Sequence, residues 1–173
     1  KGKFDELSKI RKYRESIPDW LDELGQKELG KKWDKEIAAL NQQADVVLRV
    51  NTLKTTVENL QNELADLEIE TEILSGYPDA LKLKERANVF TTDAFKNGLF
   101  EVQDASSQKV AEILDPKPGM RVIDACAGAG GKSLHIATMM ENKGQLIAMD
   151  IYENKLNELK RRARRNDIFN IET

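Results

Sequence analysis

The chain has 173 residues, which is enough for one ordinary domain or two small ones with a hydrophobic core. Its 27 basic and 30 acidic residues give a formal net charge of −3, so bulk charge does not identify a nucleic-acid-binding protein. The single cysteine, Cys126, excludes an internal disulfide, and with the single His135 it is too little for a zinc site. Neither a membrane span nor a signal peptide is visible. We therefore expect a cytoplasmic, monomeric protein without a metal.

The first part of the chain predicts three helices. Residues 1–16 are charged and predict a helix that ends at Ile17-Pro18, because the residue before a proline avoids the helical conformation. A short amphipathic helix starts at Asp19, with Gly25 or Gly30 as its stop, and residues 34–43 predict another helix. Both tryptophans, Trp20 and Trp33, are interpreted as core residues.

Residues 46–75 predict a small β-α-β unit. Val46–Val50 is rich in β-branched residues, and Ile69–Ile73 alternates apolar with acidic side chains, so both predict strands. Between them, Thr55–Glu58 has the spacing of a capping box. It precedes an apolar stripe at helical period, formed by Val57, Leu60, Leu64 and Leu67.

The middle of the chain is less regular. Short strands are expected near Leu81–Leu83 and Val89–Phe90, and a further strand over residues 98–103. Asp104 then caps a helix that covers residues 106–114, and the turn at residues 115–119 contains two prolines and a glycine that end it.

Residues 120–173 have the pattern of a parallel sheet. Apolar strands at 120–124 and 145–150 alternate with helices at 132–140 and 153–165, and residues 168–171 begin a third strand. Strands and helices that alternate in this way are typical of doubly wound α/β folds. Two complete strands and the start of a third are too few for such a sheet, so we expect further sequence beyond Thr173.

A glycine-rich loop, Asp124 to Lys132, lies between the first of these strands and its helix. Glycines there permit a tight turn and a close approach of a ligand to backbone N–H groups. Asp150 ends the next strand, 22 residues after Gly128, where a carboxylate can accept hydrogen bonds from ribose hydroxyls.

Three ligands compete for this geometry. A nucleoside triphosphate loop would need a glycine where Cys126 stands, and a dinucleotide loop would need a glycine where Ser133 stands. S-adenosylmethionine has no phosphate and carries a positive sulfonium, so Asp124 suits its methionine end. This ligand fits best; a loop that only turns the chain is the simplest alternative.

Four segments, in order, resemble the Sun/RsmB/Nop family of RNA cytosine-5 methyltransferases. Residues 122–133 resemble the family's D-x-C-A-A-P-G-G-K-[TS] motif, although Gly128-Ala129 stands where Ala-Pro is common. Residues 18–21 are similar to its P-x-W-[LI] segment and residues 48–54 to its L-R-V-N-T-L-K strand. Residues 98–107 are similar to its G-x-[FY]-x-[VI]-Q-[DE]-x-[SA]-S segment.

The resemblance implies an α/β protein with two domains. Residues 1–103 would hold the N-terminal helices and a small RNA-binding domain like an RNA recognition motif (RRM), and residues 104–173 the first, truncated part of a class I, Rossmann-like methyltransferase domain. It also implies covalent catalysis, in which a cysteine thiolate adds to carbon 6 of cytosine, so that carbon 5 takes the methyl group. Both family cysteines would lie beyond Thr173, and Cys126 matches a non-catalytic loop position. We expect no catalytic residue and no methyl transfer within this chain.

The candidate site residues follow from the loop and the resemblance. S-adenosylmethionine would contact the loop and the second strand end, namely Asp124, Cys126, Ala127, Gly128, Ala129, Gly130, Gly131, Lys132, Asp150, Ile151 and Tyr152. RNA, ribosomal or transfer, would meet basic and polar side chains of the family strand and of the basic helix, namely Arg49, Asn51, Lys54, Lys160, Arg161 and Arg164. A non-catalytic RNA- or nucleotide-binding module and an NAD(P)-dependent enzyme remain open alternatives at this point.

Overall fold

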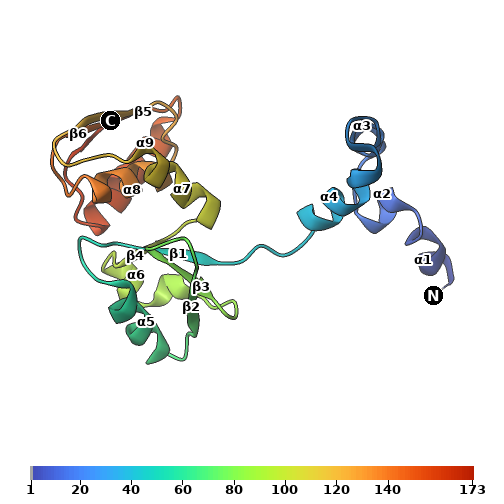
Figure 1. The fold of residues 1–173 in the computed structure, drawn as a ribbon, viewed down its shortest axis with the longest axis horizontal. Coiled ribbons are helices and arrows are strands. Elements are labelled where there is room, and N and C mark those ends of the chain that lie inside the picture. Colours follow the sequence, from blue (N-terminus) through green and yellow to red (C-terminus); the bar gives the residue numbers. More distant parts are fainter. Residues whose placement is uncertain (1) are drawn as a thin grey trace. The chain divides into compact units, whose positions relative to one another are not determined.

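The computed structural model describes residues 2–173, which form two compact units, residues 2–44 and 45–173. The first unit contains short helices (Figure 1). They are α1 (Gly2–Leu7), α2 (Arg11–Arg14), α3 (Asp19–Leu29), the 3-10 helix η1 (Gly30–Lys32) and α4 (Trp33–Leu40). The single helix predicted for residues 1–16 is therefore two helices, because Ile10 adopts an extended conformation between them.

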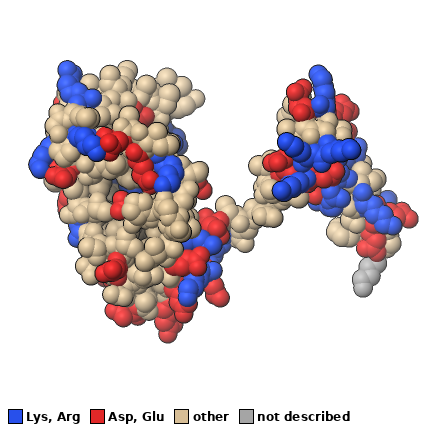
Figure 2. Space-filling model, in the orientation of Figure 1, with Lys and Arg blue, Asp and Glu red and all other residues tan. Residues whose placement is uncertain are grey.

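The first unit packs around Trp33, which is buried. A Cβ at Gly25 would lie 2.3 Å from the Trp33 ring, so only glycine lets α3 approach it. Asp22 accepts hydrogen bonds from Trp33 Nε1 (2.8 Å) and Arg11 Nε (2.6 Å). Figure 2 shows basic and acidic side chains interspersed over this unit. Trp20 is 64% exposed, so its prediction as a core residue was wrong.

The second unit begins with a four-stranded sheet. Its elements are β1 (Val47–Val50), α5 (Val57–Ala65), β2 (Thr71–Ile73), β3 (Ala80–Leu83), the 3-10 helix η2 (Val89–Thr91), α6 (Asp93–Lys96) and β4 (Phe100–Val102). The strand order is β2-β3-β1-β4 and each neighbouring pair is antiparallel. β1 and β2 are therefore parallel but separated by β3, which is the split β-α-β arrangement of ferredoxin-like domains.

The two faces of this sheet differ in chemistry. Leu48, Val50 and Phe100 pack with Leu60 and Leu64 of α5 in a fully buried apolar core. In Figure 1, α5 lies on the side of the sheet away from α7 and α8. The opposite face of β1 and β4 carries polar side chains, because successive residues of a strand alternate between faces.

Two local predictions in this part were wrong. The helix cap is Thr56, whose side chain accepts a hydrogen bond from Asn59 N, so Thr55 and Glu58 do not form the capping box. Residues 89–90 belong to η2 instead of a strand. There the Asn88 side chain accepts from Phe90 N and starts a turn, and Phe90 packs edge-on against Phe95 with ring centroids 5.0 Å apart.

A three-stranded parallel sheet follows. Its elements are α7 (Ala105–Leu114), β5 (Arg121–Asp124), α8 (Gly131–Met139), β6 (Gln145–Ala148), α9 (Glu153–Arg165) and β7 (Ile171–Glu172). The strand order is β5-β6-β7, and the third strand starts three residues later than predicted from Ile168. Asp104 caps α7 as predicted. The predicted α/β fold, an RRM-like domain followed by the start of a Rossmann-like domain, is confirmed.

Candidate cofactor-binding loop

The glycine-rich loop lies at the carboxyl edge of the parallel sheet, between β5 and α8. Met149 N donates to Asp124 O (2.8 Å) and Ala127 N donates to Met149 O (2.9 Å), so pairing continues past the ends of β5 and β6. These bonds bring the loop beside the end of the second strand. Ligands of open parallel sheets bind at this edge.

Asp124 is half-buried at the start of the loop. Ser133 Oγ donates to its Oδ2 (2.7 Å), and Cys126 N lies 3.4 Å from its Oδ1. The carboxylate therefore joins the beginning of the loop to the first turn of α8. Its negative charge is held at a fixed place beside the loop.

Asp150 holds the other side of the loop. Gly128 N donates to its Oδ2 (2.8 Å) and Tyr152 N donates to its Oδ1 (2.9 Å). The hydrogen bonds from the Tyr152 and Gly128 amides lower the pKa of Asp150, so the carboxylate is ionised at neutral pH. Each oxygen keeps a further lone pair, which can accept a hydrogen bond from a ligand hydroxyl.

The loop glycines serve two different needs. Gly128 and Gly130 have positive φ angles of 52° and 87°. A Cβ at Gly130 would lie 2.6 Å from Leu159 Cγ, so this glycine lets the loop pack on α9. A Cβ at Gly128 or Gly131 would meet nothing within 4 Å, which leaves room beside the backbone there.

Two loop carbonyls are held by buried or half-buried arginines. Arg162 Nη1 of α9 donates to Ala129 O (2.8 Å), and Arg49 Nη1 of β1 donates to Gly131 O (2.7 Å). The loop is therefore supported from the side of the four-stranded sheet, while Cys126, Lys132, Ile151 and Tyr152 remain exposed. The arrangement provides a backbone cradle with a carboxylate at each strand end.

Two family models match the chain in sequence order. The ferredoxin-like domain of RsmF/B-like methyltransferases matches residues 17–90, and the 16S rRNA methyltransferase RsmB/F model matches residues 111–172. These are the two parts that the fold contains, in the same order. The chain belongs to the Sun/RsmB/Nop family.

Curated relatives and solved structures agree with this family. The chain is 39% identical over 146 residues to a probable ribosomal RNA small subunit methyltransferase B of Synechocystis, covering 83% of this chain and 33% of the relative. It is 42% identical to the Bacillus subtilis protein of the same name, in an alignment that covers 68% of this chain and 26% of the relative. A crystal structure of a methyltransferase homologue from Pyrococcus horikoshii matches at 28% identity and TM-score 0.83, covering 94% of this chain and 53% of that one. The chain thus spans about a third of the curated relatives' length.

The predicted RNA contacts of this Sun/RsmB/Nop chain divide into buried and exposed groups. Arg49 and Asn51 are each 2% exposed, and Asn51 Nδ2 donates to Gly98 O and Asn166 O (2.9 Å each). Their side chains face the interior, so the expectation that they meet RNA does not fit the structure. Lys54 Nζ pairs with Asp167 Oδ2 at 2.7 Å. Lys160, Arg161 and Arg164 are exposed on α9 and stay predicted RNA contacts.

Sequence reasoning missed a buried charge cluster behind the loop. Glu101 of β4 is 3% exposed and pairs with both Arg162 and Arg165. Burial by itself would raise the pKa of Glu101, but the two guanidinium groups outweigh it and the pKa is lowered. One signal was available, because Arg49 and Glu101 each interrupt an apolar strand.

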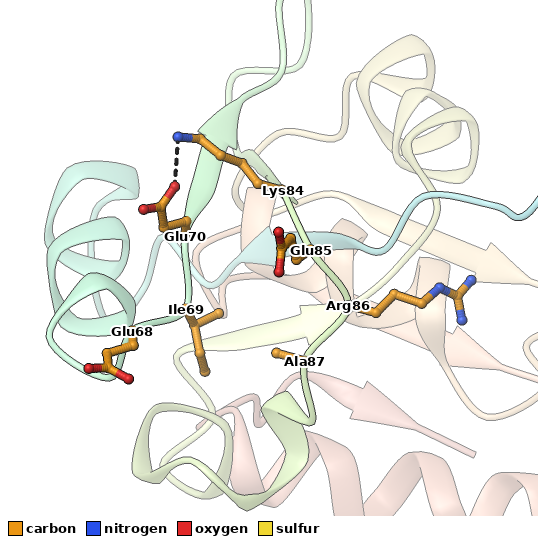
Figure 3. Close-up of a pocket in the computed structure, with 7 residues that line it drawn as sticks. All are labelled: Glu68, Ile69, Glu70, Lys84, Glu85, Arg86 and Ala87. Atoms are coloured by element: carbon orange, nitrogen blue, oxygen red, sulfur yellow. Dashed lines mark hydrogen bonds and ion pairs between the residues drawn. The ribbon is translucent and has the colours of Figure 1, made fainter.

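A pocket of about 520 Å³ lies away from the loop, in the four-stranded part (Figure 3). It is lined by Glu68, Ile69, Glu70, Lys84, Glu85, Arg86 and Ala87, and Lys84 Nζ pairs with Glu70 Oε2 at 2.9 Å. Its charged side chains are of both signs, and it includes none of the predicted site residues. Within residues 2–173, no acidic, histidine or cysteine cluster could hold a metal, and no helix is long and apolar enough to cross a membrane.

Proposed function

We propose that the chain binds S-adenosylmethionine and forms the cofactor-binding part of an RNA cytosine-5 methyltransferase. The observation that carries the proposal is the pairing of Asp150 with Gly128 N at 2.8 Å, beside a position where a Cβ would meet open space. A nucleoside can approach the backbone there, while the ionised Asp150 carboxylate accepts hydrogen bonds from its ribose hydroxyls. The family membership and the half-buried Asp150 at the end of the second strand support the same ligand.

The loop residues have distinct roles in this proposal. Asp124 attracts the ammonium and sulfonium charges of the methionine end, and Asp150 orients the ribose. Gly128 and Gly131 admit the ligand close to the backbone. Tyr152, which is 60% exposed beside Asp150, covers the adenine. A loop that carries carboxylates in this way disfavours phosphate, which argues against nucleoside triphosphates and dinucleotides.

The proposed reaction is methylation of a cytosine in RNA, with ribosomal RNA as the substrate class that the relatives' names suggest. S-adenosylmethionine supplies the methyl group from its sulfonium. The exposed Lys160, Arg161 and Arg164 of α9 would contact RNA phosphates. Cys126 lies in the glycine-rich loop, and in this proposal it takes no part in the attack on the cytosine base.

Calorimetry tests the cofactor assignment. The purified protein is titrated with S-adenosylhomocysteine, ATP and NADH, and binding of S-adenosylhomocysteine alone is expected. Asp150→Ala should weaken that binding at least about tenfold, which corresponds to about 1.4 kcal/mol. Glu70→Ala is the matched control, because it removes an exposed carboxylate from the pocket of Figure 3. Binding of ATP or NADH instead, or loss of binding in the Glu70 variant alone, would refute the assignment.

Methyl transfer provides a second test. Residues 1–173 contain one cysteine and therefore cannot supply the family's two catalytic thiols. We expect no incorporation when this chain is incubated with tritiated cofactor and cytosine-containing RNA. Robust labelling of cytosine carbon 5 would show that Cys126 or another group acts as the nucleophile.

A further inference from the structure

We propose that the polar face of the four-stranded sheet positions the cofactor loop, with Arg49 and Glu101 as the positioning residues. The identity of the ligand rests on the proposed function, whereas the contacts between the sheet and the loop are independent of it. In an RRM-like domain this face would be the open one, away from the helices. Here its β1–β4 half is covered by the methyltransferase part.

The two residues lie together by strand register. Arg49 and Glu101 are Cα partners across the antiparallel pair β1–β4, so their side chains leave the same face. They are 2% and 3% exposed, although Leu48, Val50 and Phe100 beside them pack into the core of the other face. Two opposite charges are thus buried where the four-stranded sheet meets the glycine-rich loop and α9.

Arg49 reaches the loop directly. Its Nη1 donates to Gly131 O at 2.7 Å and also to Gln103 Oε1, and among the described residues it makes no ion pair within 4.0 Å. Burial, above all, lowers the pKa of Arg49 to about 10. A buried cation that faces carbonyl oxygens is less favourable than an apolar side chain of similar size. Packing alone therefore does not account for an arginine at this position.

Glu101 reaches the loop through α9. Its Oε2 pairs with Arg162 Nη2 at 2.9 Å, and the same guanidinium donates through Nη1 to Ala129 O at 2.8 Å. Arg165 and Asn166 also donate to Glu101 Oε1. The carboxylate thus fixes the plane of the Arg162 guanidinium, whose planar donors have a fixed geometry.

These contacts orient the loop's amide groups. In a trans peptide the C=O and the N–H point in opposite directions. Holding Gly131 O against Arg49 therefore directs Lys132 N–H, one of the first amides of α8, away from the sheet and toward the exposed side. Ala129 O held by Arg162 fixes the preceding peptides. The polar face of the sheet therefore fixes the conformation of the loop in the absence of a ligand.

The test compares cofactor affinity with stability. Arg49→Gln and Arg162→Gln each remove a donor to the loop, and both should weaken S-adenosylhomocysteine binding about tenfold or more, measured well below each variant's unfolding midpoint. Arg49→Lys keeps the charge but has no planar pair of donors, and should fall between Arg49→Gln and the parent protein. Leu64→Ala is the matched control, because it destabilises the same sheet from its apolar face without touching the loop.

Hydrogen exchange gives a second readout that needs no ligand. The amides of Gly128 to Lys132 should exchange faster in Arg49→Gln and Arg162→Gln than in the parent protein, and remain unchanged in Leu64→Ala. If the variants bind S-adenosylhomocysteine like the parent and their loop amides exchange at the parent rate, the positioning role is wrong. If the parent does not bind S-adenosylhomocysteine, the proposed function fails, and the exchange rates still decide the positioning role.

Discussion

His135 is a buried histidine behind the glycine-rich loop, one turn into α8. It is 3% exposed, and its Nδ1 has no hydrogen-bond partner among the described residues. Burial, together with the nearby positive charge of Arg49, lowers the pKa of His135 from 6.5 to about 3. The folded protein therefore holds His135 neutral, whereas the unfolded chain protonates it below its ordinary pKa.

This difference predicts an acid-sensitive stability. A lowered histidine pKa leaves the free energy of unfolding almost unchanged above the ordinary pKa of 6.5. Below that pH the unfolded state binds a proton that the folded state does not, so the free energy of unfolding falls as the pH drops toward 3. We expect a loss of about 2 kcal/mol between pH 7 and pH 5 from this residue alone. Urea unfolding at both pH values should show that loss in the parent protein and a clearly smaller one in His135→Leu. Equal losses in the two proteins would mean that His135 titrates normally.

Gly130 is the loop glycine that packing requires. An alanine there would have a φ of 87° and a Cβ 2.6 Å from Leu159 Cγ. Gly130→Ala should lower the free energy of unfolding by about 1–3 kcal/mol, because backbone strain and overpacking add.

Gly131→Ala is its matched control, since a Cβ there meets nothing and the position begins a helix. Its unfolding free energy should stay at or slightly above the parent value. Denaturant unfolding of Gly130→Ala and Gly131→Ala measures the two free energies of unfolding. Equal stabilities would show that α9 yields to the extra methyl group.

At the scale of elements, apolar periodicity and the Asp104 cap allowed helices to be predicted from the sequence, whereas the predicted capping box at Thr55 was wrong. The range of α9 was predicted as observed, because its apolar positions repeat at helical spacing between Tyr152 and Asn166. The contribution of Arg49 could not be predicted, since it depends on which sheet face the following domain covers. For the same reason the strand motif was interpreted as an RNA contact. The prediction of a strand at residues 89–90 was wrong, because the Asn88 side chain accepts a hydrogen bond from Phe90 N and forms a turn in spite of the β propensity of Val89 and Phe90.

The cap of α7 joins the two parts of the second unit. The Asp104 side chain accepts from Ser106 N at 2.8 Å and from Ser107 N, just after β4 ends. Asp104→Ala should lower the free energy of unfolding by about 1 kcal/mol, because the first amides of α7 lose their acceptor. Asp104→Asn keeps an acceptor and should lose less. Thermal unfolding of the three proteins measures the order, and an unchanged alanine variant would exclude a structural role for this cap.

At the scale of the molecule, residues 45–173 form one compact unit that contains both sheets. The sequence predicted both sheets and the loop between β5 and α8. The division between domains at residue 103 stays a prediction. At that point only two residues separate the end of β4 from the start of α7. The buried pairs between Glu101 and α9 tie the parts together. A ligand at the loop is therefore expected to stabilise the whole second unit, by an amount that grows with the logarithm of its concentration over its dissociation constant.

A crystal structure of the protein soaked with S-adenosylhomocysteine tests the central claim most directly. We predict the nucleoside over the backbone of Gly128 to Gly131, with ribose hydroxyls on Asp150 and the amino-acid end near Asp124. The contacts from Arg49 and Arg162 to the loop carbonyls should be unchanged. A ligand bound elsewhere, or a phosphate group in this loop, would contradict the account.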